Sequence, residues 1–436
     1  MHTTSSGRYL LVTLFLFLQT PFQAAGQTLA PLDLLPGQET ISAEPFIRGD
    51  SLTLQAALRR AMVSHPSLEG ARAAIRAGEA RLVQAGKRLN PALSIEFGKQ
   101  GQTPAGAAAF ESTILLEQTL RLGNKRGHSK TVAAGDIALS QWSARSRALD
   151  LYTEVHGAYN LALIAREDLR LKEELLGIAR NLHEGTRQRV GAGKASPAEA
   201  ARAAIILARH EMALSRARET DILARETLAG ICGIASGALP ALSGNFDALI
   251  SLPPQDSLRS LLNRNPALAA YQAAEARQMA AIALADAGAI PDPVIGGGIK
   301  YLNSQEDVAV LFSLSLPLPL TDRNQGDRLA AREILNRIRA ERRALALQLG
   351  LELDRARRAF ELSRSEVLAL REKIIPGAEL AFQNISEGYA RGRFNFLDLL
   401  DAQRTLFESR DSLLHALREF HGAAIEIEKL TASALH

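Results

Sequence analysis

The sequence predicts a mostly helical chain made of two tandem repeats, each of which contributes two strands to a membrane β-barrel. Two observations lead to this prediction. The same landmarks recur in the same order with an offset of about two hundred residues. Between long helical patterns, four short segments alternate apolar residues with polar or small ones. The expected order within each repeat is therefore helix, two strands, long helix, turn and helix.

The N-terminus has the three parts of a secretory signal peptide. Arg8 supplies a positive charge, Tyr9 to Leu18 form an apolar stretch, and Ala24-Ala25-Gly26 offer small residues for cleavage. An uncleaved anchor is the alternative, but roughly ten apolar residues are too few to span a bilayer as a helix. We expect a signal peptide at 1–26, an extended segment at 27–50, and a mature protein that leaves the cytoplasm.

The composition indicates a folded chain without the features of a nucleic-acid-binding protein. Of the 436 residues, 47% are hydrophobic, which is enough for a sizeable core. The 51 basic and 47 acidic residues are spread along the chain without a polybasic block. The single cysteine, Cys232, rules out an intrachain disulfide and leaves none for lipidation after the signal peptide. Because no later run reaches about 18 apolar residues, any membrane crossing must use strands.

Three pairs of similar segments define the internal repeat. They are HPSLEGARAAIRAG and NPALAAYQAAEARQ, then EQTLRLGNKRG and SLPLPLTDRNQG, then RVGAGKASPAEAARA and YARGRFNFLDLLDAQ, which begin at His65, Asn265, Glu117, Ser315, Arg189 and Tyr389. Three landmarks in one order make a duplication the best explanation. We predict repeat 1 at 51–232, a Gly/Pro-rich linker at 233–254, and repeat 2 at 255–436.

The helical segments after the strands carry a coiled-coil seam. No proline occurs from 127 to about 189, and a helix of that length would extend roughly 90 Å. In repeat 2 the seam residues follow a three/four spacing, with Ser363 at the one polar position. They are Leu349, Leu353, Ala356, Phe360, Val367, Leu370 and Ile374, and after a turn Leu399, Ala402, Leu406, Ser409, Leu413, Ala416, Phe420 and Ala423. A single charged coiled coil would also explain this periodicity.

The four alternating segments are typical of membrane-barrel strands. We predict them at about 92–101, 109–120, 293–302 and 307–317. In the first, Leu93, Ile95 and Phe97 alternate with Ser94, Glu96 and Gly98. A half-buried soluble sheet is the alternative. Four strands cannot close a barrel, and an open sheet edge is not tolerated in lipid, so several chains must contribute.

The prolines of SLPLPLTDRNQG mark the end of the last strand. Pro317 and Pro319 lack a backbone donor and have a fixed φ, so they end strand pairing and predict a rigid joint between barrel and helix. Thr321 or Asp322 is expected to cap the helix that begins near Asn324.

These features resemble the TolC-like outer-membrane efflux channels, and within them the cobalt-zinc-cadmium (CzcC-like) branch. The segments IPDPVIGGGIKY and SLPLPLTDRNQG carry the resemblance, which covers the chain from about Ser51 to its end. It implies a homotrimer with a twelve-stranded barrel in outer-membrane lipid and a twelve-helix tunnel extending into the periplasm. The chain departs from the branch at Thr321, where Phe is frequent, and in lacking a lipidated N-terminal cysteine, which leaves the barrel as its anchor.

The segment YARGRFNFLDLLDAQRT predicts an aperture at the far end of the helices. Asp398 and Asp401 are three residues apart and share nearly one helix face, so a trimer would form a ring of six acids that attracts cations. The resemblance places an aspartate pair at this distance after the turn glycine, here Gly392, at the periplasmic aperture. The alternative is a pair of solvated or capping charges, and the repeat 1 counterparts Glu199 and Arg202 have mixed charge.

The resemblance also implies further residues at this end. Tyr389 matches a tyrosine of the family's closing network, whereas Arg393 comes one residue before the family's arginine, whose place is taken by Phe394. The two turns contain Gly191, Gly193, Lys194 and Gly392, and the resemblance implies that they accept a periplasmic adaptor (membrane fusion protein). Helix-ending glycines explain the same residues equally well.

The sequence does not indicate catalysis. Its histidines are scattered without an i, i+4 pair, and Gly296-Gly297-Gly298 lies within a strand rather than in a phosphate loop. We expect no enzyme activity, no cofactor and no resident metal site. The predicted function is the outer-membrane channel of a tripartite system with an inner-membrane RND pump, exporting divalent heavy-metal cations, a cargo implied by the resemblance alone. The alternatives are the same channel for drugs or type I protein secretion, and a secreted coiled-coil scaffold without a pore.

Overall fold

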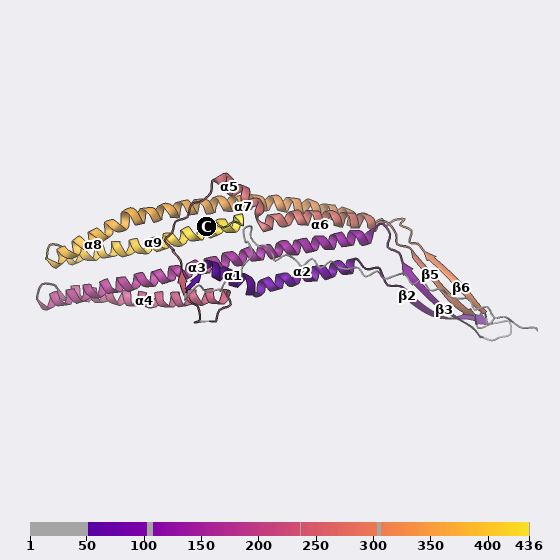
Figure 1. The fold of residues 1–436 in the computed structure, drawn as a ribbon, viewed down its shortest axis with the longest axis horizontal. Helices are drawn as coiled ribbons and strands as arrows, with labels where there is room; N and C mark the ends of the chain where they lie inside the picture. Colours follow the sequence, from indigo (N-terminus) through magenta and orange to yellow (C-terminus); the bar gives the residue numbers. More distant parts are fainter. Residues whose placement is uncertain (1–50, 103–107, 236, 303–306, 436) are drawn as a thin grey trace, which may run out of the picture. The chain divides into compact units, whose positions relative to one another are not determined.

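The computed structural model describes residues 51–102, 108–235, 237–302 and 307–435. The predicted signal peptide at 1–26 and the extended segment at 27–50 lie outside the described residues. The described chain is mostly helical, with one four-stranded and one two-stranded sheet (Figure 1).

Each repeat follows the predicted order of elements. Repeat 1 contains α1 (Leu54–Ser64), α2 (Pro66–Ala85), β2 (Ala92–Gln102), β3 (Ala108–Thr119), α3 (Lys125–Gly191) and α4 (Pro197–Ile231). Repeat 2 contains α5 (Gln255–Leu261) with a 3₁₀ turn (Leu262–Arg264), α6 (Pro266–Gly288), β5 (Val294–Leu302), β6 (Asp307–Ser315), α7 (Gln325–Ala369), a π-helical turn (Leu370–Ile374), α8 (Ile375–Ala390) and α9 (Phe396–Thr431). Strand β6 ends before Pro317, which has no N–H for a further ladder bond.

The hairpins of the two repeats join into one antiparallel sheet in the order β2-β3-β5-β6. Ile114 in β3 lies opposite Ile95 in β2 and opposite Ile299 in β5, so these apolar side chains share one face. That face is solvent-exposed in the single chain, and its members include Leu93, Ile95, Phe97, Ile114, Leu116, Ile295, Ile299, Tyr301, Val308, Val310, Phe312 and Leu314. On the other face, Lys300 forms an ion pair of 2.6 Å with Glu111.

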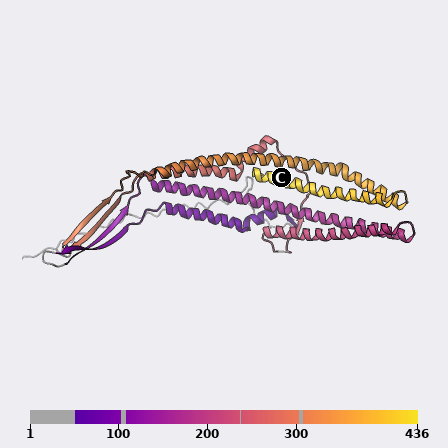
Figure 2. The same cartoon turned by 180° about the vertical axis from the view of Figure 1, so that it is seen from behind.

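The long helix of each repeat has one helix beside each of its halves. Helix α3 has 67 residues and therefore extends roughly 100 Å. Figures 1 and 2 show α2 beside the half of α3 nearer the strands and α4 beside the other half. Helices α6 and α9 accompany α7 and α8 in the same way. The largest core cluster lies at the middle of α3, around Leu151, Val155 and Ala162.

The predicted linker at 233–254 contains a strand that sequence analysis did not anticipate. Strand β4 (Ala241–Ser243) pairs in parallel with β1 (Ser51–Thr53). The Tyr159 hydroxyl on α3 donates a hydrogen bond of 2.9 Å to the Leu52 carbonyl oxygen and so fixes this pair to the core. Strands of three residues are too short to show periodicity, which explains why the sequence did not predict them.

The prediction of the coiled-coil seam in α7 is wrong for its last residue. The seam residues from Leu349 to Leu370 are buried as predicted, including Ser363, but Ile374 is 47% exposed. The π-helical turn Leu370–Ile374 explains the difference, because the wider turn rotates the residues after it away from the seam.

The predicted cap of the same helix is also wrong. The N-cap residue of α7 is Asn324, which has a left-handed φ of 58° and makes no side-chain capping bond. Instead of capping the helix, Asp322 accepts a 2.9 Å hydrogen bond from the Asn324 backbone N–H. Asn124 precedes α3 with a φ of 53°, so both long helices begin after a left-handed asparagine.

Candidate functional site

The turns at the far ends of the long helices have the same construction in both repeats. Gly193 and Gly392 have φ angles of 68° and 75°, a region that favours glycine. The next N–H groups, of Lys194 and Arg393, donate 2.8 Å bonds back to the carbonyl oxygens of Arg189 and Gly388. These bonds form a Schellman-type helix end, which by itself accounts for the two left-handed glycines.

The helices that follow these turns both begin with a capping box. In α9, Asn395 Oδ1 accepts from the Asp398 N–H at 2.9 Å, and Asp398 Oδ2 accepts from the Asn395 N–H at 3.0 Å. Ser196 and Glu199 make the equivalent pair at the start of α4. One carboxylate oxygen of Asp398 is therefore bound to the helix end, as the capping alternative expects.

Asp401 has a different environment from Asp398. It is exposed one turn further along α9, whereas Asp398 is half-buried. The carboxylate of Glu408 and, to a smaller extent, that of Asp401 raise the pKa of the neighbouring Arg404 guanidinium. Asp398 and Asp401 thus lie near each other at the tip, but Asp401 is the more open carboxylate.

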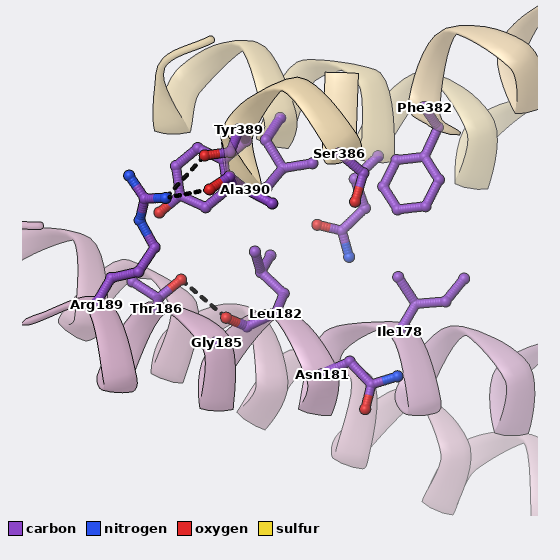
Figure 3. Close-up of a pocket in the computed structure, with 12 residues that line it drawn as sticks. Ile178, Asn181, Leu182, Gly185, Thr186, Arg189, Phe382, Ser386, Tyr389 and Ala390 are labelled. Carbon is purple, nitrogen blue, oxygen red and sulfur yellow. Dashed lines mark hydrogen bonds between the residues drawn. The ribbon is translucent and has the colours of Figure 1, made fainter. Parts of the chain in front are cut away.

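Tyr389 contacts an arginine other than the one that the sequence suggested. Its buried ring lies 4.4 Å from the Arg189 guanidinium carbon, and Arg189 donates hydrogen bonds to the carbonyl oxygens of Tyr389 at 2.8 Å and Ala390 at 3.3 Å (Figure 3). The Tyr389 hydroxyl donates to Glu199 at 3.4 Å. Arg393 is exposed in the turn.

Sequence analysis did not select Arg189 or Glu199 as site residues. Arg189 precedes its turn glycine by four residues and Tyr389 precedes its own by three, so the two residues occupy neighbouring rather than equivalent positions of the repeats, and the repeat gave no signal for their contact. Their contact joins the last turn of α3 to the last turn of α8. The tips of the two helical hairpins are therefore held together within one chain.

A cavity of about 490 Å³ lies between the hairpins next to this contact. Figure 3 shows Leu182 and Thr186 of α3 opposite Phe382, Ser386 and Tyr389 of α8. Its wall is mainly apolar, so the hairpins are not tightly packed against each other here.

The joint residues Pro317 and Pro319 lie in the exposed segment between β6 and α7. Arg323 Nε donates to the Pro319 carbonyl oxygen at 3.4 Å. The Asn324 side chain donates a 2.9 Å bond to the Ala285 carbonyl oxygen of α6, which connects the joint to the helices.

No group of three or more His, Cys, Asp or Glu side chains within the described ranges is arranged to hold a metal ion. No helix in those ranges is both long and apolar enough to cross a membrane.

The repeats and the sheet with one exposed apolar face are features of a membrane-channel protein, and comparison with known families gives the class. The model of the outer membrane efflux protein family matches residues 57–233 and 257–433, one match in each repeat, and the chain belongs to this family. The prediction of an internal duplication within this family is thereby confirmed. Because the family is one of efflux proteins, the expectation that the chain is not an enzyme also holds.

The chain is also similar to individual proteins and solved structures. The chain is 30% identical over 394 residues to the cobalt-zinc-cadmium resistance protein CzcC of Cupriavidus metallidurans, covering 90% of this chain and 93% of that protein. Structures of CusC and of the open MtrE outer membrane channel of Neisseria gonorrhoeae superpose with TM-scores of 0.74 and 0.72 at 17% and 19% identity. The CusC match covers 87% of this chain and 91% of CusC, and the MtrE match covers 92% and 95%. These structures show the shared fold.

Proposed function

We propose that the protein is the outer-membrane channel of a tripartite efflux system that exports divalent heavy-metal cations. The proposal that the protein is a membrane channel rests on the four-stranded sheet. One face of this sheet is apolar and exposed, and its two edge strands, β2 and β6, each have one edge without a strand partner in the described chain. Such edges are not stable in lipid, so sister chains must pair with them.

A homotrimer is the assembly that this proposal requires. Each chain supplies four strands of one sheet, and three chains would close a barrel of twelve strands, within the range of known outer-membrane barrels. Beyond the strands, each chain would contribute four helices to the tunnel, so that the trimer would have twelve. The exposed apolar face would then contact outer-membrane lipid, and the face with Glu111 and Lys300 would line the lumen.

The residues at the two ends of the helices have proposed roles in this assembly. Asp398, Asp401, Tyr389 and Arg393 surround the periplasmic aperture, with Arg189 as the contact partner of Tyr389. The exposed turn residues dock the periplasmic adaptor, which connects the channel to the inner-membrane RND pump, and they are Gly191, Gly193, Lys194 and Gly392. Pro317 and Pro319 form the rigid joint between barrel and tunnel.

Heavy-metal cations are the proposed cargo because the relative CzcC, similar over 90% of this chain, is a cobalt-zinc-cadmium resistance protein. The open carboxylate of Asp401 near the tip is compatible with passage of cations. The described residues contain no chelating cluster, and a duct that releases its cargo does not require one.

The proposal is tested with a strain that lacks the gene. We expect the deletion to lower tolerance of Zn²⁺, Co²⁺ and Cd²⁺ and to leave tolerance of hydrophobic drugs unchanged, with recovery on complementation. Purified protein in planar bilayers should give single-channel conductance. Loss of drug tolerance without loss of metal tolerance would contradict the cargo, and a detergent-independent, non-conducting protein would contradict the channel.

A further inference from the structure

A second cavity, of about 460 Å³, lies where repeat 1 changes from strands to helices. Its wall comes from the residues before β2, the end of β3, the segment between β3 and α3, and the start of α3. Three arginines, Arg88, Arg121 and Arg126, line it together with Gln118, Thr119 and Asn124 and the leucines Leu89, Leu120 and Leu122. The cavity therefore combines positive charge, hydrogen-bonding groups and apolar side chains.

All three arginines are exposed, and two of them have no acidic partner among the described residues. Neither Arg88 nor Arg126 forms an ion pair or a side-chain hydrogen bond in the part of the chain that the structure describes. The nearby carboxylate is Asp292, whose Oδ1 accepts from Lys125 Nζ at 2.8 Å. Burial alone would raise the pKa of Asp292, but the Lys125 and Leu122 hydrogen bonds and the charges of Lys125 and Arg121 lower it, so it stays ionised and paired.

The cavity lies at the end of the apolar sheet face. Gln118 is paired in register with Ile295, a member of that exposed face, and its amide donates to the Leu89 carbonyl oxygen at 3.1 Å. Leu89 and Leu120, which are 45% and 39% exposed, come beyond the last paired residues of β2 and β3. Lipid that covers the apolar face would end at this level, where its headgroups begin.

We infer that this cavity binds the anionic phosphodiester headgroup of an outer-membrane phospholipid. The arginine guanidinium groups match phosphate oxygens in charge and geometry, and the exposed leucines extend the acyl-chain contact of the sheet. The start of α3, whose N-cap Asn124 makes no side-chain capping bond, places the positive end of the helix dipole next to Arg126. The inference rests on the outer-membrane location of the sheet and needs no assumption about cargo.

The second repeat provides an internal comparison. The repeat offset makes Gly288, at the end of α6, the equivalent of Arg88, and Gly326, at the start of α7, the equivalent of Arg126, and prolines follow β6 before α7. Arg323, the basic residue there, donates to the Pro319 carbonyl oxygen. The headgroup site therefore belongs to repeat 1 and has no counterpart among the residues of repeat 2 that the structure describes.

The test measures lipid binding to the full-length protein in detergent by native mass spectrometry, with dioleoylphosphatidylglycerol and dioleoylphosphatidylcholine as probes. Wild type should bind the anionic lipid more tightly than the zwitterionic one. The double variant Arg88→Gln/Arg126→Gln should bind the anionic lipid about twenty-fivefold more weakly, since each arginine near an anionic headgroup contributes about fivefold. The control Lys87→Gln/Arg323→Gln removes two basic charges that do not line the cavity and should bind like wild type.

Three results would overturn the inference. Equal binding of both lipids to wild type would show that charge does not select the headgroup, and equal losses in the two double variants would show only a general surface effect. Displacement of the anionic lipid by an equal concentration of inorganic phosphate would make the cavity a free-anion site. The comparison of the two lipids on wild-type protein tests the inference even if a variant fails to fold. Single-channel conductance is measured separately and tests the proposed channel function.

Discussion

At the residue scale, Asp398 and Asp401 lie one turn apart but carry different interactions. Asp398 shares a capping box with Asn395, and Asp401 is exposed. We therefore expect Asp398→Ala to lower the free energy of unfolding by about 1 kcal/mol, the usual cost of a lost cap. Asp401→Ala should leave stability unchanged. Thermal or denaturant unfolding of the two variants in detergent measures this difference, and equal losses would contradict the separate environments.

The same pair predicts how cations block the channel. In the proposed trimer each aspartate contributes three charges to a narrow ring, so removal of both should weaken Zn²⁺ blockade of single-channel conductance by about tenfold. Asp401→Asn alone should produce most of this change, because its carboxylate is not engaged in capping. Unchanged blockade in Asp398→Asn/Asp401→Asn would reject the acidic aperture. The exposed Glu387→Gln on α8 serves as the charge-matched control for the single variant Asp401→Asn.

His210 on α4 predicts a pH dependence of stability. Burial and the positive charge of Lys172 lower the pKa of His210, and its ring packs edge-on against Phe407 at 5.1 Å. The folded state therefore favours the neutral ring, and the unfolded chain binds the proton more readily. Stability is fully present above the ordinary histidine pKa near 6.5 and falls as the pH drops below it.

This dependence can be measured by thermal unfolding between about pH 7.5 and about pH 5. His210→Gln should flatten the decrease in melting temperature relative to wild type, whereas the exposed His415→Gln should retain the wild-type slope. An identical slope in His210→Gln and wild type would show that His210 is not responsible.

At the element scale, the hairpins α3/α4 and α8/α9 meet through the Arg189–Tyr389 contact beside the 490 Å³ cavity. Arg189→Ala removes a cation–π contact and two hydrogen bonds and should destabilise the protein by about 1 to 3 kcal/mol. Tyr389→Phe loses only a 3.4 Å bond to Glu199 and should cost less than about 1 kcal/mol. If the tips close the channel, Arg189→Ala should also increase basal conductance.

The comparison for this prediction is Arg393→Ala, which alters an exposed turn arginine close to the same tip. It should retain the wild-type free energy of unfolding. A decrease equal to that of Arg189→Ala would contradict a specific stabilising role of the Arg189–Tyr389 contact. Conductance of all three variants in one bilayer composition separates loosening of the tip from a change in folding.

The elements that the sequence predicted are those with many periodic residues. Seam residues such as Leu353, Phe360 and Phe420 repeat over many turns, so their burial could be predicted from spacing alone. The π-helical turn at Leu370–Ile374 and the three-residue strand β4 are set by local and tertiary contacts, which leave no periodic trace. The Asn324 cap was missed because its left-handed backbone, rather than a capping side chain, begins the helix.

Only those parts of the candidate site at the helix tips that depend on local sequence could be predicted. The turn glycines and the aspartates follow from local sequence, since both depend on residues close along the chain. The partner of Tyr389 lies 200 residues away in the other repeat, and a local motif suggested Arg393 instead. The basic cavity at the first joint was also missed, because Arg88 and Arg126 are brought together by the β2–β3 hairpin between them.

At the scale of the whole molecule, the exposed apolar face distinguishes a membrane barrel from a soluble sheet. Phe312 is 87% exposed in the single chain and lies opposite Gly297, on the face that would contact lipid. In a barrel, Phe312→Lys places a charge in hydrocarbon at a cost of about 2 to 4 kcal/mol, so we expect loss of outer-membrane insertion and of heat-modifiable trimers. In a soluble sheet the same change would be neutral or would improve solubility.

The neighbouring Leu311→Lys provides the matched comparison, because alternation directs residue 311 to the opposite face, across from Gly298. In the proposed barrel that face lines the lumen, where a lysine is hydrated, and the variant should still insert and form trimers. Membrane fractionation and unheated gel electrophoresis of the two variants measure the outcome. If Phe312→Lys inserts as well as Leu311→Lys, the apolar face does not contact lipid, and the open edges of β2 and β6 require an explanation other than a membrane barrel.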